Sequence, residues 1–230
     1  NTTGTQSVAV GSLALDANTT ASYHTAVGYK ALSANTTGAQ NTAVGYAALD
    51  ESTTGNDNVA VGNNCMGKNT TGVNNTAVGS FALDANTTAS NNIAVGYGAL
   101  GGNTTGTSNT ALGYSALIAN TTASNNTAVG HQALTANTTG LGSNVAIGYQ
   151  ASLANTTGNN NITIGVYAGK SNTTGSDSCA VGPHCLYSNT TGSGNQAFGY
   201  ASLYDNTTGG NNTAVGSQAL ANNTTASNNS

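Results

Sequence analysis

Charge is the scarcest feature of this sequence. The 230 residues include three Lys or Arg and seven Asp or Glu, so the net charge is −4 and charged residues make up 4% of the chain. Soluble domains usually contain about 25% charged residues. The sequence has no basic patch, and this absence argues against nucleic acid and anionic membrane surfaces as partners.

Trp is absent, Phe is rare, and long apolar runs are also missing. The sequence has no Trp, two Phe, one Pro and three Cys. Such a chain is poorly suited to filling a wide globular core, but Val, Leu and Ala can fill a thin one. No apolar run approaches the roughly 18 residues that a membrane-spanning helix needs, so we expect no membrane insertion.

The dominant feature of the sequence is a 17-residue repeat. Each copy carries a marker glycine after an apolar residue, and the markers lie 17 residues apart except for one step of 18. The marker glycines are Gly11, Gly28, Gly45, Gly62, Gly79, Gly96, Gly113, Gly130, Gly148, Gly165, Gly182, Gly199 and Gly216. A short fixed period is typical of solenoids. We therefore predict a single continuous array over residues 1–230. Because both ends fall within a repeat, we expect the array to be a segment of a longer fibre protein.

The pattern within the repeat predicts short strands and tight turns. Residues 41–44 read Asn-Thr-Ala-Val before the marker, which is typical of a short strand, and Tyr-x-Ala-Leu after the marker indicates a second one. Asn-Thr-Thr-Gly supplies a turn. The predicted fold is all-β: a parallel β-solenoid (β-roll or β-helix) with one flattened two-strand coil per 17-residue repeat, about 13 coils in all. The extra residue of the 18-residue step, within residues 140–143, should lie in a turn.

The core is expected to contain the Val before the marker and the Leu of the second strand. A charge at Val95 should then open the stack, because an unpaired buried charge is costly. A charge at Tyr97, which lies at a variable position, should be tolerated.

The Asn-Thr-Thr turns are also N-glycosylation sequons. Because a nearly uncharged β stack needs a hydrophilic cover, we predict glycans on many of them. The alternative is a ladder of asparagine side chains that bond coil to coil. The predicted glycosylation sites are Asn1, Asn18, Asn35, Asn69, Asn86, Asn103, Asn120, Asn137, Asn155, Asn172, Asn189, Asn206 and Asn223, with further sequons at Asn74, Asn125, Asn161 and Asn211.

The side chains that carry most enzyme chemistry are few and scattered. Cys179 and Cys185 flank one marker glycine, and two interpretations remain open for them: a disulfide, or small thiols that fill the core. The three histidines, His24, His131 and His184, occupy different positions of distant repeats, and Asp16, Asp50 and Asp84 lie in alternate repeats. We therefore predict solvated turns at these aspartates, and no catalytic residues, metal site, cofactor or enzymatic activity.

The repeat resembles sequences of known surface proteins. Ser7-Val8-Ala9-Val10-Gly11 and residues 144–148, Asn-Val-Ala-Ile-Gly, are similar to the head repeats of trimeric autotransporter adhesins. The longer pattern, N-T-A-V-G-Y-x-A-L-x-x-N-T-T-G, looks like arrays in phage tail-fibre-like and cell-surface proteins. The resemblance implies parallel β-rolls, often trimeric, in extended extracellular fibres that adhere. The period of 17 and the Asn-Thr-Thr turn differ from the adhesin heads.

Three functions follow as hypotheses. The first is a structural extracellular fibre, non-catalytic and N-glycosylated, whose chains self-associate, as homotrimers if the adhesin resemblance holds. The second is the shaft or head of a trimeric adhesin or phage tail fibre. The third is a solenoid that binds ice or polysaccharide through its rank of threonines. Each places the chain outside the cell, on a cell or virion surface, or in secretions.

Overall fold

The computed structural model describes residues 3–230. The chain falls into two compact units, Asn1–Tyr114 and Ser115–Ser230. The regular elements of the described residues are three-residue strands, and none of these residues belongs to a helix that could cross a membrane. The first unit contains β1 (Val8–Val10), β2 (Thr25–Val27), β3 (Thr42–Val44), β4 (Val59–Val61), β5 (Thr76–Val78), β6 (Ile93–Val95) and β7 (Thr110–Leu112). The second contains β8 (Thr127–Val129), β9 (Val145–Ile147), β10 (Ile162–Ile164), β11 (Cys179–Val181), β12 (Gln196–Phe198) and β13 (Thr213–Val215).

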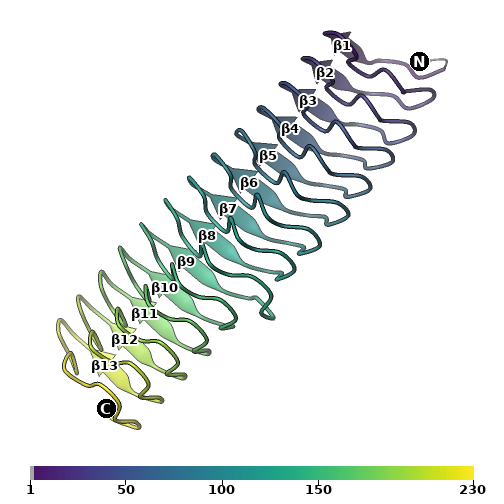
Figure 1. Ribbon diagram of the computed structural model, residues 1–230. Helices are drawn as coiled ribbons and strands as arrows, with labels where there is room; N and C mark the ends of the chain where they lie inside the picture. Colours follow the sequence, from purple (N-terminus) through teal and green to yellow (C-terminus); the bar gives the residue numbers. More distant parts are fainter. Residues whose placement is uncertain (1–2) are drawn as a thin grey trace. The chain divides into compact units, whose positions relative to one another are not determined.

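Each unit is a stack of coils with one strand per coil. Successive strands pair in parallel, and equivalent repeat positions stand side by side, as Ala26 does with Ala43. In Figure 1 the strands of each unit follow one another as rungs, with the connecting loops in equivalent places. The prediction of an all-β parallel solenoid with a 17-residue coil is therefore confirmed.

The extra residue does not disturb the ladder. Thr127 of β8 pairs with Val145 of β9 across a step of 18 residues, and the register of the later strands is unchanged. Leu141 is 86% exposed, which marks where the turn bulges outward. The predicted place of the insertion, within residues 140–143, is correct, because a turn absorbs an added residue at little cost.

The side chains inside the coil differ from those expected. From β2 on, the central residue of the strand is buried, whereas the residue before the marker glycine is half-buried or exposed, as Ala94 and Val95 of β6 illustrate. Residues two apart in a strand share a face, so this Val lies on the same face as Ile93. The prediction that Val lies in the core is wrong, while the prediction for Leu, such as Leu100, is right. A charge at Val95 is therefore not expected to open the stack, because this side chain lies on the outer face.

The expected second strand is a run of turns. In the third coil of the first unit, Ala47 and Leu49 have φ values of 50° and 53°. These left-handed conformations cost roughly 1–2 kcal/mol each for residues other than Gly. Complete burial of the Leu49 side chain offsets this cost, because burying a leucine contributes about 1.5–3 kcal/mol. Each coil therefore has one strand and not two.

Candidate functional site

From Asn18 on, the asparagine of each Asn-Thr-Thr turn points into the coil. Asn35 Nδ2 donates one hydrogen bond to the carbonyl of Gly38, at 3.0 Å, and a second to Oδ1 of Asn18 in the preceding coil, at 3.2 Å. Asn86 donates in the same way to Asn69, at 2.7 Å. We call this column the turn ladder. It closes the turn within a coil and joins that coil to its neighbour.

The turn ladder contradicts the predicted glycosylation at its positions. A buried amide leaves no room for a sugar, and where the ladder is continuous, as at Asn35 and Asn86, its Nδ2 already donates to two acceptors. Asn223 is half-buried with the same two bonds, and Asn1 lies outside the described residues. The buried side chains are Asn18, Asn35, Asn69, Asn86, Asn103, Asn120, Asn137, Asn155, Asn172, Asn189 and Asn206. The structure therefore has the asparagine ladder that the sequence offered as the alternative.

The two threonines of the turn differ in exposure. Thr36 Oγ1 donates to the carbonyl of Thr53 in the next coil, at 3.0 Å, so the first Thr joins coils. The second Thr, such as Thr37, is exposed in every described coil. Coil stacking thus explains the Asn and the first Thr of the motif without a transferase that recognises them.

Ser52 interrupts the turn ladder, and its replacement should stabilise the protein. Ser52 Oγ and Asn35 Oδ1 are both buried without a hydrogen-bond partner. Ser52→Asn would supply an Nδ2 donor to Asn35, and an orphaned buried acceptor costs about 1–3 kcal/mol. We expect the free energy of unfolding to rise by ~1–2 kcal/mol, measured in urea at unchanged slope. Ser12→Asn, on an exposed residue, should be neutral, and equal effects of the two changes would contradict the ladder.

A second column of asparagines precedes the strands. Asn41 Oδ1 accepts from the backbone N–H of Asn58, at 3.0 Å, and its Nδ2 donates to the carbonyl of Gly55, at 2.7 Å. We call this column the strand ladder. Its members from Asn41 to Asn212 are buried, and they include Asn161, so that sequon is also closed to a glycan. His24 takes the place of Asn in this column: its Nδ1 accepts from the N–H of Asn41, at 3.3 Å.

His24 should make the first unit sensitive to acid. Burial lowers the pKa of this imidazole below its ordinary value, against smaller opposing effects of hydrogen bonds with the Asn41 and Gly38 backbone. The unfolded chain therefore binds the proton more tightly, so stability is full above pH ~6.5 and falls as pH drops toward the lower folded pKa. Thermal midpoints between neutral and mildly acidic pH should show this slope. His24→Asn, which restores the consensus residue, should abolish the slope, and equal slopes would contradict the assignment.

Three of the additional sequons do face solvent. Asn74, Asn125 and Asn211 are exposed in the turn before the strand, each with φ between 55° and 61°. Nothing in the coil stack blocks a glycan at these three positions. The sequence could not separate them from the buried sequons, because exposure depends on which way the turn directs each side chain.

Cys179 and Cys185 belong to one coil but differ in burial. Cys179 is half-buried on the outer face of β11, whereas Cys185 is buried and its Sγ contacts the carbonyl of Gly182 at 2.8 Å. All three thiols are free, so the Cys179–Cys185 disulfide is not formed. Burial raises the pKa of Cys65 and of Cys185 to about 12. Neither buried thiol is therefore suited to act as a nucleophile near neutral pH.

Acidic side chains gather at one place in the first unit. Asp50, Glu51 and Asp84 line a small pocket of about 120 Å³ together with Lys68. Asp84 is half-buried, and burial raises the pKa of its carboxyl, so the prediction of a fully solvated turn does not hold for this residue. Among residues 3–230, no three His, Cys, Asp or Glu are grouped so as to hold a metal ion.

Aromatic rings form stacks that sequence analysis missed. Tyr29 stacks on Tyr46 with ring centroids 5.4 Å apart, and in the second unit Tyr187 stacks on Tyr204 at 5.1 Å. Both pairs occupy equivalent positions of adjacent repeats, so the signal was present in the spacing. A larger cluster extends from the second pair and adjoins a pocket of about 310 Å³ that includes His184.

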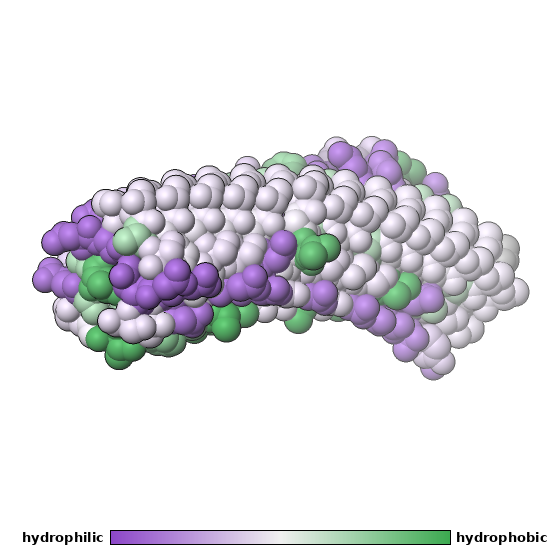
Figure 2. Space-filling view, turned by 90° about the horizontal axis from the view of Figure 1, so that it is seen from below, coloured by the Kyte–Doolittle hydropathy of each residue, from purple (hydrophilic) through white to green (hydrophobic). Residues whose placement is uncertain are grey.

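The outer surface carries little charge. In Figure 2 most of the visible face is near neutral in hydropathy, while hydrophilic and hydrophobic residues gather in rows and small clusters. The outward strand positions are uncharged in every coil and include exposed side chains such as Ile93, Leu112 and Ile147. No family model, curated protein or solved structure matches the sequence. Function must therefore be inferred from this geometry.

Proposed function

We propose that the chain is a structural, non-catalytic segment of an extracellular fibre, and that it associates with further copies of itself through the outer face of its strands. The supporting observation is the pair of outward positions on each strand. They hold Thr, Val, Ile or Leu in most coils and a charged residue in none. Contiguous exposed apolar surface is a feature of interaction sites.

A second copy is the occupant that fits this face best. Every copy presents the same ranks at the same coil spacing, ~4.8 Å, so two faces can interdigitate along their length. Like charges do not oppose this contact, because none lies on the face. Ile93 is 45% exposed and Val78 is 37% exposed. Association of two chains through this face would therefore remove the apolar surface of such side chains from water.

Two substitutions that each introduce one aspartate can show whether the outer face or the neighbouring turn mediates self-association. Val95→Asp places a charge on the outer face of β6, and Tyr97→Asp places one two residues away in the turn. We expect both proteins to fold, the first to remain monomeric and the second to associate as the wild type does. Sedimentation velocity at several concentrations measures this. A wild type that is always monomeric, or equal association of the two variants, would contradict the proposal, whereas a trimeric wild type would favour the adhesin-like arrangement.

The exposed threonines support a second candidate function. The second Thr of each turn is exposed in every described coil, and these hydroxyl and methyl groups recur at the coil spacing of ~4.8 Å. A regular row of this kind suits a crystalline surface such as ice or packed polysaccharide. Ice recrystallisation assays test it: inhibition lost in Thr54→Lys and Thr71→Lys supports the candidate, and no inhibition by the wild type rejects it.

A further inference from the structure

One column of the second unit ends with an aromatic ring that the column covers on one face only. It consists of Lys170, Tyr187, Tyr204 and Ala221, which occupy the same position of four successive repeats. Lys170 Nζ lies 5.5 Å from the ring centroid of Tyr187, and the rings of Tyr187 and Tyr204 are nearly parallel, at 8°. Ala221 carries no ring, so this column covers only one face of Tyr204.

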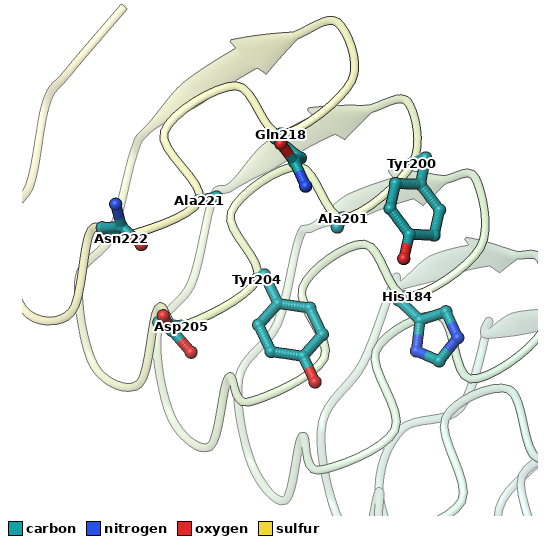
Figure 3. A pocket seen from close by; sticks show the side chains of 8 residues that line it. All are labelled: His184, Tyr200, Ala201, Tyr204, Asp205, Gln218, Ala221 and Asn222. Carbon is teal, nitrogen blue, oxygen red and sulfur yellow. The ribbon is translucent and has the colours of Figure 1, made fainter.

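The place that a further ring would occupy adjoins an open pocket. The pocket has a volume of about 310 Å³, at the lower end of the range for small-molecule sites. His184 and Tyr200 form a second wall, with ring centroids 6.0 Å apart and an interplanar angle of 71°. Figure 3 shows these rings together with Tyr204, which lies beside Asp205.

Polar side chains surround the aromatic surface. Asp205, Gln218 and Asn222 line the same pocket, from the two coils that also supply Tyr204 and Ala221. A carboxylate accepts hydrogen bonds, and each amide both donates and accepts them. The pocket therefore offers one flat apolar wall and several hydrogen-bonding groups around it.

We propose that this pocket binds a pyranose ring of an uncharged glycan. The apolar C–H face of such a sugar would stack on Tyr204 at the unoccupied step of the column, while its hydroxyl groups bond to Asp205, Gln218 and Asn222. An aromatic side chain from another protein would leave these three polar groups without partners, and unpaired polar groups cost free energy. The carboxylate of Asp205 disfavours acidic sugars. None of the lining residues belongs to a strand, so this site is separate from the outer face proposed for self-association.

Titration with soluble glycans tests the proposal on the full chain. The probes are neutral hexasaccharides of β-1,4-linked glucose, β-1,4-linked N-acetylglucosamine and α-1,4-linked glucose, and isothermal titration calorimetry measures their affinity for the wild type and for each variant. We expect at least one probe to bind. Tyr204→Ala removes the stacking surface and Ala221→Tyr fills the unoccupied step, so each should weaken that binding about tenfold or more.

Two control variants separate the site from general effects on the fold. Tyr97→Ala removes an exposed ring in the other unit, and Thr135→Tyr adds a ring at the position equivalent to Ala221 in a distant coil. Both should bind like the wild type. Absence of binding by every sugar, or unchanged affinity in Tyr204→Ala and Ala221→Tyr, would overturn the proposal. Binding of N-acetyltyrosine amide in place of the sugars would reassign the pocket to an aromatic side chain. Because sedimentation measures association independently, either proposal can fail alone.

Discussion

Ala94→Asp is expected to lower the free energy of unfolding by about 3–5 kcal/mol. Ala94 is the central residue of β6 and is completely buried, so the carboxylate would lie in the thin core without a partner. A methyl group is the largest side chain that this position holds in most coils, and a larger one would also separate the two walls of the coil. Urea unfolding followed by circular dichroism measures the loss.

Val95→Asp supplies the matched control for this change. It places the same carboxylate one residue further along the strand, on the outer face, where water can solvate it. We expect a loss of less than about 1 kcal/mol, within the range of strand preferences. A larger loss for Val95→Asp than for Ala94→Asp would mean that the assignment of inner and outer faces is reversed.

Gly79→Ala should be the second most damaging single change, costing more than about 2 kcal/mol. A Cβ at this marker glycine would lie 2.6 Å from the carbonyl oxygen of Gly96 in the next coil. The backbone φ of 132° is also strained for any residue with a side chain. Both costs fall on the coil contact itself, so the midpoint of thermal unfolding should drop clearly.

Gly216→Ala separates these two contributions. Gly216 has a similar φ of 122°, but a Cβ there meets nothing within 4 Å. We therefore expect only the backbone cost, and a correspondingly smaller change in the midpoint. Equal losses at Gly79 and Gly216 would show that strain, and not the approach of neighbouring coils, explains the marker glycine.

The repeat step made the coil architecture predictable, and the direction of the side chains was harder to infer. In the segment Thr42-Ala43-Val44, strand alternation places Thr and Val on one face and Ala on the other. The hydrophobicity of Val favoured placing it inside, but the coil is too thin for that arrangement and buries the smaller Ala43. The turn after the marker looked like a strand because its left-handed residues, such as Leu49, are not visible in composition.

The candidate site was also only partly predictable, because the sequence does not show which way a side chain points. A sequon identifies an asparagine that a transferase can recognise, but it does not show whether that side chain faces solvent. Asn86 and Asn74 both occur in sequons, and only the folded turn shows that the first is buried and the second exposed. The pocket beside Tyr204 depends on Ala221 in the following coil, and an alanine in a variable position gives no signal by itself.

Hydrogen exchange of the asparagine side-chain amides is the most direct test of the central claim, that the Asn-Thr-Thr asparagines hold the coils together from within. Two-dimensional NMR can follow the Nδ2 protons of Asn86, which donate to Asn69 and to the carbonyl of Ala89, beside those of the exposed Asn74. The structure predicts slow exchange at Asn86, set by opening of the stack, and fast exchange at Asn74. Exchange at Asn86 as fast as at Asn74 would contradict the inward-facing ladder.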